Sequence, residues 1–222
     1  MSLVAENVRA GHRPDSPVLD GAGIEIPRGQ TIGLTGPSGA GKTTLARVCA
    51  LLHHPWSGRV SVDGVEVPRR ADAPPEIRRA VAMLFQSPRQ STSPRLTLER
   101  IVAEPLVLAR APRAERADVV RAAAARVGLT ADLLARRPHQ VSDGQLQRAC
   151  LARALVQRPR YLICDEMTAM LDPATTAALV AVLREETSAG LGVLAVSHDH
   201  ALLGAWADDV VELPVSPGAR TP

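Results

Sequence analysis

The residues best suited to chemistry form a glycine-rich segment early in the chain. The segment satisfies the pattern G-x-x-x-x-G-K-[ST] in full and reads Gly36-Pro37-Ser38-Gly39-Ala40-Gly41-Lys42-Thr43-Thr44. Glycines let backbone amides turn toward phosphate oxygens, and the N-terminus of a following helix adds partial positive charge. Lys42 should reach the β- and γ-phosphates of a nucleotide, while the Thr43 hydroxyl should bind Mg²⁺. The segment therefore predicts binding of ATP and Mg²⁺ rather than a plain glycine-rich turn.

The basic composition draws further attention to Lys42. The chain contains 26 Lys and Arg residues, and Lys42 is the only lysine among them. A lysine kept in a chain that otherwise uses arginine indicates chemistry that suits a compact ammonium and not a wide planar guanidinium. Chance placement is the alternative, so this observation supports the glycine-rich segment without deciding its role.

Two acidic residues form the second candidate group. Asp165 and Glu166 follow the apolar run Tyr161–Cys164. A buried parallel strand that ends in acids delivers them to the crevice where α/β proteins bind ligands. Asp165 is expected to bind Mg²⁺, and Glu166 to polarise the attacking water. Such strand endings are common on their own, and it is the pairing with the glycine-rich segment that favours a catalytic reading.

The positions of these groups require particular secondary structure. Short apolar runs bounded by Pro, Gly and Asp-Gly predict strands, and apolar spacing of three to four residues predicts helices. The expected strands are 3–8, 23–26, 31–34, a hairpin over 58–62 and 65–67, 81–85, 161–164 and 193–196. The expected helices are 42–53, 98–108, 113–127, 131–134, 143–157 and 173–187. The pattern indicates an α/β core interrupted by a helical block.

Composition excludes several other classes. The net charge is +3 with a pI of about 9.1, and only 2% of residues are aromatic. No basic stripe interleaved with aromatics is visible, so no nucleic-acid partner is expected. The three cysteines, Cys49, Cys150 and Cys164, lack metal-binding spacing and are interpreted as core residues. The sequence shows neither a secretory leader nor 18 consecutive apolar residues, which favours a soluble cytoplasmic chain unless a partner holds it at a membrane.

Six motifs in the expected order make the chain resemble the nucleotide-binding subunits of ABC transporters over residues 3–212. Besides the glycine-rich loop and the acidic strand, a signature near LSGGQ is represented by Val141-Ser142-Asp143-Gly144-Gln145. A glutamine after a strand is Gln86, the D-loop is Ala169-Met170-Leu171-Asp172, and a histidine after the last strand is His198.

The resemblance implies an α/β fold. It would have a P-loop NTPase core, an N-terminal antiparallel β subdomain and an inserted α-helical subdomain at about 94–158. Residues 1–213 would form a single ABC ATPase domain, with 214–222 as a disordered tail.

The resemblance also implies roles for the remaining site residues. ATP on the loop of one subunit would be enclosed by Ser142, Gly144 and Gln145 of a second subunit, where a helix N-terminus suits an anion. His198 would contact the γ-phosphate, Gln86 would sense Mg²⁺ or water, and Asp172 would lie at the same composite site. Alternative interpretations are a polar strand end for Gln86, a core histidine for His198 and a helix N-cap for Asp172.

Three departures from the family pattern concern the nucleotide site. Asp143 replaces the first glycine of the signature and adds a carboxylate near the expected γ-phosphate. His12 stands where an adenine-stacking aromatic is expected, and Met167 stands where the family often has proline. The first two changes predict a composite site that closes or turns over slowly, unless the Asp143 carboxylate points to solvent; Met167 has no interpretation.

The run QSPRQSTSPRLT from Gln86 to Thr97, with Glu104-Pro105-Leu106, resembles importers of peptides and nickel. That resemblance implies membrane permeases, a second ATPase subunit, identical or different, and indirectly an extracytoplasmic binding protein. The expected location is the cytoplasmic face of the cell membrane, and the short C-terminal region favours a nickel- or metallophore-type subunit. Two alternatives stay open: a soluble ABC ATPase that transports nothing, and a regulatory nucleotide-binding subunit with weak hydrolysis.

Overall fold

The chain divides into two compact units, described separately below. The computed structural model describes residues 1–11, 16–67, 73–169 and 171–215. The first unit comprises residues 1–83, 160–166 and 186–222, and the second comprises 84–159 and 167–185. The expected insertion at 94–158 lies inside the second unit, and the domain boundaries proposed from the sequence stay a prediction. Residues 216–222 of the expected tail lie outside the described residues.

An antiparallel sheet in the first unit has the strand order β2-β1-β4-β5. Alternate residues of β1 are buried, as a strand with one face on the core requires. The turn between β4 and β5 places both Asp63 (φ 51°) and Gly64 (φ 82°) in the left-handed region, the geometry that Asp-Gly hairpins adopt. The strands are β1 (Ser2–Ala10), β2 (Leu19–Pro27), β4 (Ser57–Val62) and β5 (Val65–Glu66).

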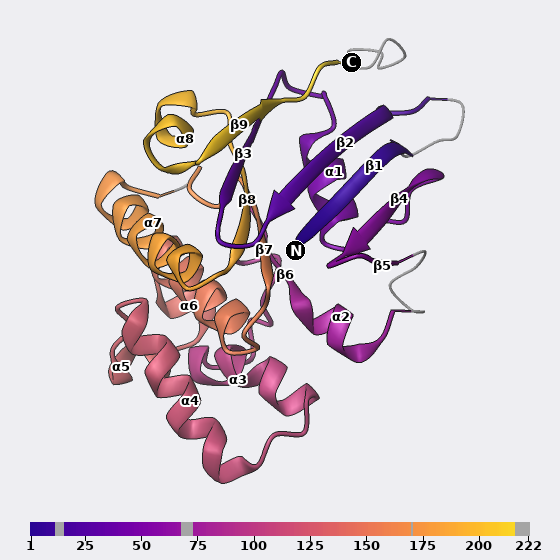
Figure 1. The fold of residues 1–222 in the computed structure, drawn as a ribbon. Helices are drawn as coiled ribbons and strands as arrows, with labels where there is room; N and C mark the ends of the chain where they lie inside the picture. Colours follow the sequence, from indigo (N-terminus) through magenta and orange to yellow (C-terminus); the bar gives the residue numbers. More distant parts are fainter. Residues whose placement is uncertain (12–15, 68–72, 170, 216–222) are drawn as a thin grey trace. The chain divides into compact units, whose positions relative to one another are not determined.

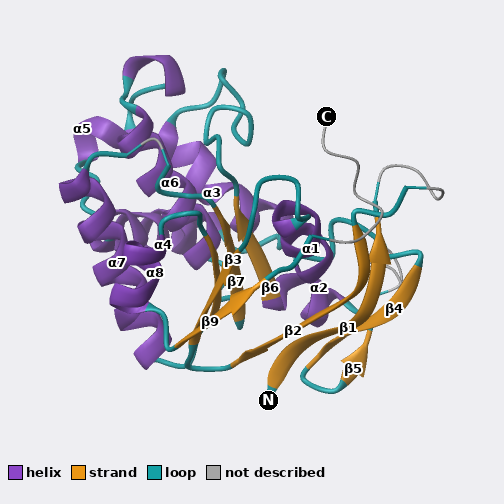
Figure 2. Ribbon diagram, turned by 90° about the horizontal axis from the view of Figure 1, so that it is seen from above, coloured by secondary structure: helices purple, strands orange, loops and turns teal. Residues whose placement is uncertain are grey.

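A second sheet has the order β6-β7-β8-β3-β9, and the pairs β7–β8, β8–β3 and β3–β9 are parallel. Its strands are labelled in Figure 1, and Figure 2 draws the strands in orange. All residues of β3, β7 and β8 are buried, which explains their nearly continuous apolar sequences. Because parallel strands end at the same edge, Thr35, Asp165 and Val196 lie together at the carboxyl edge of the sheet. The strands are β3 (Thr31–Thr35), β6 (Val81–Leu84), β7 (Tyr161–Asp165), β8 (Gly192–Val196) and β9 (Asp209–Glu212).

Helix α1 (Lys42–Cys49) follows β3 and contacts strands of both sheets. Its buried residues Leu45, Ala46, Val48 and Cys49 belong to the core of the first unit. The other helices that begin in this unit are short: α2 (Pro75–Ala80) and α8 (His200–Trp206). The core therefore fixes the start of α1 beside the carboxyl edge of β3.

Helices α3, α4 and α6 pack against one another in the second unit (Figure 1). Helix α6 buries nearly its whole length, and α4 buries small residues such as Ala123 and Ala124, which permit close approach. The helices are α3 (Leu98–Leu108), α4 (Arg113–Arg126), α5 (Ala131–Leu134), a 3₁₀ turn (Pro138–Gln140), α6 (Asp143–Leu155) and α7 (Pro173–Ser188), whose last residues belong to the first unit.

The fold class predicted from the sequence is confirmed, and the expected strands and helices all occur. Helices α3 and α5 have the expected bounds, and the other elements have shifted ends. Helix α1 ends at Cys49 and not at residue 53, since Leu51 adopts φ 60° and stops the helix. The sequence did not indicate α2, α8 or β9. The two helices are shorter than two full turns, and β9 is an edge strand with mostly exposed residues, so none of them carries a readable periodicity.

Candidate functional site

The glycine-rich loop joins β3 to α1 in the first unit. Gly36 has φ 146°, and a Cβ atom there would lie 2.5 Å from the Leu213 carbonyl oxygen, so only glycine fits. Gly41, with φ 97°, occupies the N-cap position of α1. The first backbone N–H groups of α1 therefore follow directly on this loop, an arrangement that favours anions.

Lys42 lies beneath this loop and is nearly buried, with 9% of its surface exposed. Its Nζ donates hydrogen bonds to the carbonyl oxygens of Gly36 (2.7 Å) and Pro37 (3.0 Å). These carbonyls hold the ammonium at the loop, where phosphate oxygens can become additional acceptors. The lone lysine of the chain is thus a fixed positive charge inside the candidate site.

Thr43 and Asp165 meet at the carboxyl edge of the parallel sheet. The Thr43 hydroxyl donates to Asp165 Oδ1 at 3.1 Å, although the residues are 122 positions apart. Burial raises the pKa of Asp165 above its usual value and Glu166 adds to this, whereas the Thr43 hydrogen bond, Arg47 and Lys42 lower it. A hydroxyl and a carboxylate oxygen side by side are the hard donors that Mg²⁺ prefers, so these residues fit the cation.

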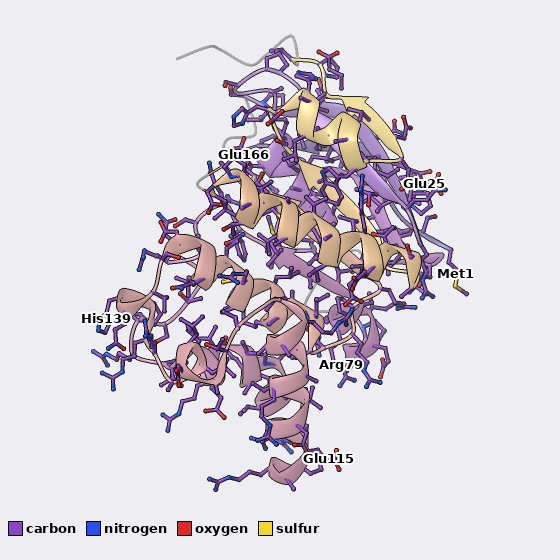
Figure 3. The ribbon with its side chains drawn as sticks, turned by 90° about the vertical axis from the view of Figure 1, so that its left-hand side faces the viewer. Met1, Glu25, Arg79, Glu115, His139 and Glu166 are labelled. Atoms are coloured by element: carbon purple, nitrogen blue, oxygen red, sulfur yellow. The ribbon has the colours of Figure 1, made fainter. Side chains whose placement is uncertain are left out.

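Glu166 follows β7 with an unusual backbone (labelled in Figure 3). Its φ of 47° is rare for a residue with a side chain, and its N–H donates to the Val196 carbonyl at 3.0 Å. Glu166 Oε1 lies 3.7 Å from His198 Nδ1. His198 is 69% exposed in its side chain, which excludes the alternative of a core histidine. The strand ends thus place an acid and an imidazole next to each other.

A pocket of about 460 Å³ lies beside the glycine-rich loop and Glu166. Besides the loop and Glu166, the pocket is lined by residues that precede β2. The sequence did not single them out, because they belong to no periodic pattern or motif. The lining residues are Ser16, Pro17, Val18, Ser38, Gly39, Gly41, Lys42, Thr43, Thr44 and Glu166. His12, expected to replace the adenine-stacking aromatic, lies outside the described residues.

The signature segment forms the N-terminus of α6 in the second unit. The Ser142 hydroxyl accepts the N–H of Gln145 at 3.2 Å, and the Gln145 side chain accepts the N–H of Ser142 at 3.0 Å. This is a reciprocal capping box, and it leaves the Ser142 O–H hydrogen available to an anion. The sequence predicted a helix start here, and the structure shows what holds it.

The unexpected carboxylate of Asp143 is paired. Arg89 Nε lies 2.7 Å from Asp143 Oδ1, and that oxygen is shielded from solvent. The expectation that Asp143 either faces solvent or weakens the site did not include this partner. Arg89 lies in a loop with no helical or strand periodicity, so its proximity could not be read from the sequence.

Asp172 and Gly144 meet through Thr175, also in the second unit. Asp172 accepts hydrogen bonds from the Thr175 N–H (2.9 Å) and hydroxyl (2.6 Å), which lower the pKa of this carboxyl. Asp172 therefore caps the start of α7, as the alternative interpretation proposed. A Cβ atom on Gly144 would lie 3.1 Å from the Thr175 methyl, so the glycine allows this turn to pack on the signature.

Gln86 is exposed just after β6. It follows Phe85, whose carbonyl accepts a hydrogen bond from Gln147 of α6 at 3.4 Å. Met167, which follows Glu166, is buried with 5% of its surface exposed. Exposure favours a role for Gln86 in contact with another group, and that role stays a prediction.

Comparison with known families adds a decisive observation: residues 19–169 match the model described as "ABC transporter". The chain belongs to the ABC transporter family. It is 37% identical over 198 residues to the oligopeptide transport ATP-binding protein OppF of Salmonella typhimurium, covering 87% of this chain and 59% of that protein. It is 42% identical over 185 residues to the methionine import ATP-binding protein MetN of Thermobifida fusca, covering 82% and 56%.

This ABC family chain thus spans less than two thirds of the length of these two relatives. Its fold is that of a solved ABC transporter cassette, MJ0796, in a dimeric structure, with a TM-score of 0.86, 24% identity, and coverage of 99% of this chain and 100% of that one. A second structure of MJ0796, bound to ADP and Pi, gives a TM-score of 0.85. Across the part of the chain that the structure describes, no helix is long and apolar enough to cross a membrane.

Proposed function

We propose that this chain is the ATP-binding and ATP-hydrolysing subunit of an ABC importer. One observation carries the proposal: the carboxyl edge of a single sheet holds a phosphate-binding loop, an oxygen pair suited to Mg²⁺, and an acid beside an imidazole. These are the groups that phosphoryl transfer to water requires. The family membership supports the same activity.

Each site residue of the first unit then has a defined role in ATP binding or hydrolysis. The loop amides and Lys42 bind the β- and γ-phosphates of ATP, while Thr43 and Asp165 hold Mg²⁺, which neutralises charge on the phosphates. Glu166 accepts a hydrogen bond from the attacking water and orients it toward the γ-phosphorus. His198, beside Glu166, donates to a γ-phosphate oxygen.

The second unit supplies the other part of a composite site. The capped N-terminus of α6 presents the Ser142 hydroxyl and the backbone N–H groups of Gly144 and Gln145, all donors suited to phosphate oxygens. We propose that these donors act on ATP bound to a second ATPase subunit, with Asp172 near the same interface and Gln86 following the state of the γ-phosphate. Dimerisation then controls turnover.

Transport is the finer part of the proposal. The relatives named for oligopeptide transport and methionine import support an import function with a small peptide or amino acid as cargo. The resemblance of residues 86–97 to peptide and nickel importers adds a metal chelate as a further candidate cargo. The chain would bind membrane permeases at the cytoplasmic face of the membrane. A tagged chain expressed with its neighbouring membrane proteins should co-purify with a permease, and repeated isolation of the chain alone would contradict the transport role.

The activity itself is tested by replacing Glu166 with Gln. Because a glutamine amide is not basic enough to take a proton from the attacking water, we expect ATPase turnover to fall about 100-fold or more while ATP binding persists. ATP should then stabilise a dimer of the E166Q protein, measured by light scattering. The matched control is E185Q, an exposed glutamate on α7, which should keep normal turnover. Unchanged turnover in E166Q would remove Glu166 from the catalytic role.

A further inference from the structure

Asp143 brings a negative charge to the first turn of α6. The same turn offers the hydrogen-bond donors that we propose for a phosphate. A carboxylate there is favourable for the helix alone, because it faces the positive end of the helix dipole. It is unfavourable for a phosphate that must approach the same N-terminus, since like charges repel. The signature can therefore bind phosphate well only if another group offsets this repulsion.

Arg89 lies where its positive charge can offset the Asp143 carboxylate. Its Nε lies 2.7 Å from Asp143 Oδ1, its Nη1 donates to the Pro138 carbonyl at 2.8 Å, and its Nη2 donates to the Val141 carbonyl at 3.1 Å. One guanidinium thus contacts the turn before the signature and the first residue of α6. Only the planar fork of arginine reaches such divergent acceptors at once.

Two further contacts join the segment around Arg89 to α6. Gln147 donates to the Phe85 carbonyl at 3.4 Å, and Arg153 donates to the Ser91 carbonyl at 2.7 Å. The segment 85–91, which contains Gln86, is therefore attached to α6 at its start, middle and end. All these residues belong to the second unit, so hydrogen bonds and an ion pair connect the segment that contains Gln86 to the signature.

We propose that Arg89 is a positioning residue for the signature. It neutralises the Asp143 carboxylate and holds Ser142 and Gly144 in the orientation that binds phosphate, while tying that orientation to the segment of Gln86. The inference rests on the proposed function, because it concerns the phosphate site that the signature completes in a second subunit. The inference predicts that the effect of Arg89 on turnover depends on the aspartate at position 143.

A double-mutant cycle tests this dependence, using the full chain in its assembled, ATP-hydrolysing form. We expect R89Q to lower kcat about tenfold, because the carboxylate is left unpaired beside the phosphate site. D143G should stay within about threefold of the wild type, and R89Q/D143G should resemble D143G. R95Q, an exposed arginine of the same loop, is the matched control and should keep the wild-type kcat.

The binding constant of a fluorescent ATP analogue for the single chain distinguishes a local effect from a general loss of structure, because unfolding would weaken this binding. We expect it to be unchanged in R89Q, because the phosphate loop lies in the other unit. Equal losses of kcat from R89Q in the wild-type chain and in the D143G variant would overturn the inference. If R89Q does not fold, R89M replaces it, since methionine removes both the charge and the fork and should show the same dependence on residue 143.

Hydrogen exchange separates this inference from the proposed function. R89Q should speed amide exchange over residues 138–146, and R95Q should not. A wild-type chain that binds but does not hydrolyse ATP in its assembled form would contradict the proposed function. In that case faster exchange in R89Q would still support the positioning role, and unchanged exchange would overturn it.

Discussion

The phosphate loop of the first unit and the signature of the second differ in what fixes them. The loop is fixed by backbone geometry: Gly36 adopts φ 146° against the Leu213 carbonyl, and the strand that precedes it is completely buried. The signature is fixed by side chains, through the capping box of Ser142 and the contacts of Arg89. A site fixed by backbone geometry tolerates few substitutions. A site held by side chains tolerates more, and here Arg89 offsets the charge of Asp143.

The comparison predicts that changes in the loop abolish binding itself. Replacing Lys42 with Ala removes the positive charge held beneath the loop. We expect ATP affinity and turnover each to fall by about 100-fold or more, because a preorganised charge in a shielded site contributes on this scale. Titration with a fluorescent ATP analogue measures the affinity. The exposed Arg79 on α2 of the same unit provides a control in R79A, and normal affinity in K42A would contradict the assignment of the loop.

Changes in the signature should affect turnover and spare binding to the single chain. Gly144→Val places a branched side chain where even a Cβ atom would lie 3.1 Å from Thr175. The turn that carries Asp172 must then move, and we expect kcat to fall by about tenfold or more while ATP affinity of the isolated chain changes less than about twofold. Matched measurements of kcat and of the binding constant test this, and a parallel loss of affinity would show that the two regions are not separable in this way.

The same difference explains what the sequence could predict. Lys42, Thr43, Asp165 and Glu166 could be singled out as candidates because each is attached to a strand end or a helix start, and such positions follow from local patterns. Parallel strands then bring Thr43 to Asp165 across 122 residues without further information.

Other features depend on side chains from irregular segments. The pairing of Arg89 with Asp143 follows no period, and neither does the pocket wall at Ser16–Val18. The hydroxyl of Thr175, which binds Asp172, gave no signal either, because threonine is common in helices and only its place beside the N-cap matters. Contacts of this kind become visible only when the fold places the loops.

The scaffold of the first unit should show a smaller but measurable dependence on one buried hydroxyl. Tyr161 of β7 donates its O–H to the Asp63 carboxylate in the β4–β5 turn, and Arg160 Nη1 lies 2.6 Å from the other carboxylate oxygen. Burial, together with Asp63, raises the pKa of Tyr161, so the phenol stays a donor. Tyr161→Phe should lower the free energy of unfolding by about 1–2 kcal/mol, because Asp63 is left with fewer donors.

Denaturant unfolding measures that change, and ATP affinity provides the contrast. The phenyl ring keeps the packing of Tyr161, so we expect the affinity of the single chain to stay within about twofold of the wild type. Arg28, an exposed basic residue of the same unit, offers the control R28Q with a smaller effect on stability. A large loss of affinity in Y161F would show that the hairpin turn and the phosphate loop are coupled.

The smallest expected effect concerns the cap of α6. Ser142→Ala removes the acceptor for the Gln145 N–H and breaks the capping box. Loss of a serine cap costs about 1 kcal/mol, which lowers Tm by about 2–4 °C in a chain of this size. The same change removes a donor to the proposed phosphate, so turnover should fall further than the small loss of stability alone would cause. Ser142→Thr keeps both the cap and the hydroxyl. If S142A and S142T lose turnover equally, then the side-chain volume at this position matters and the hydroxyl does not.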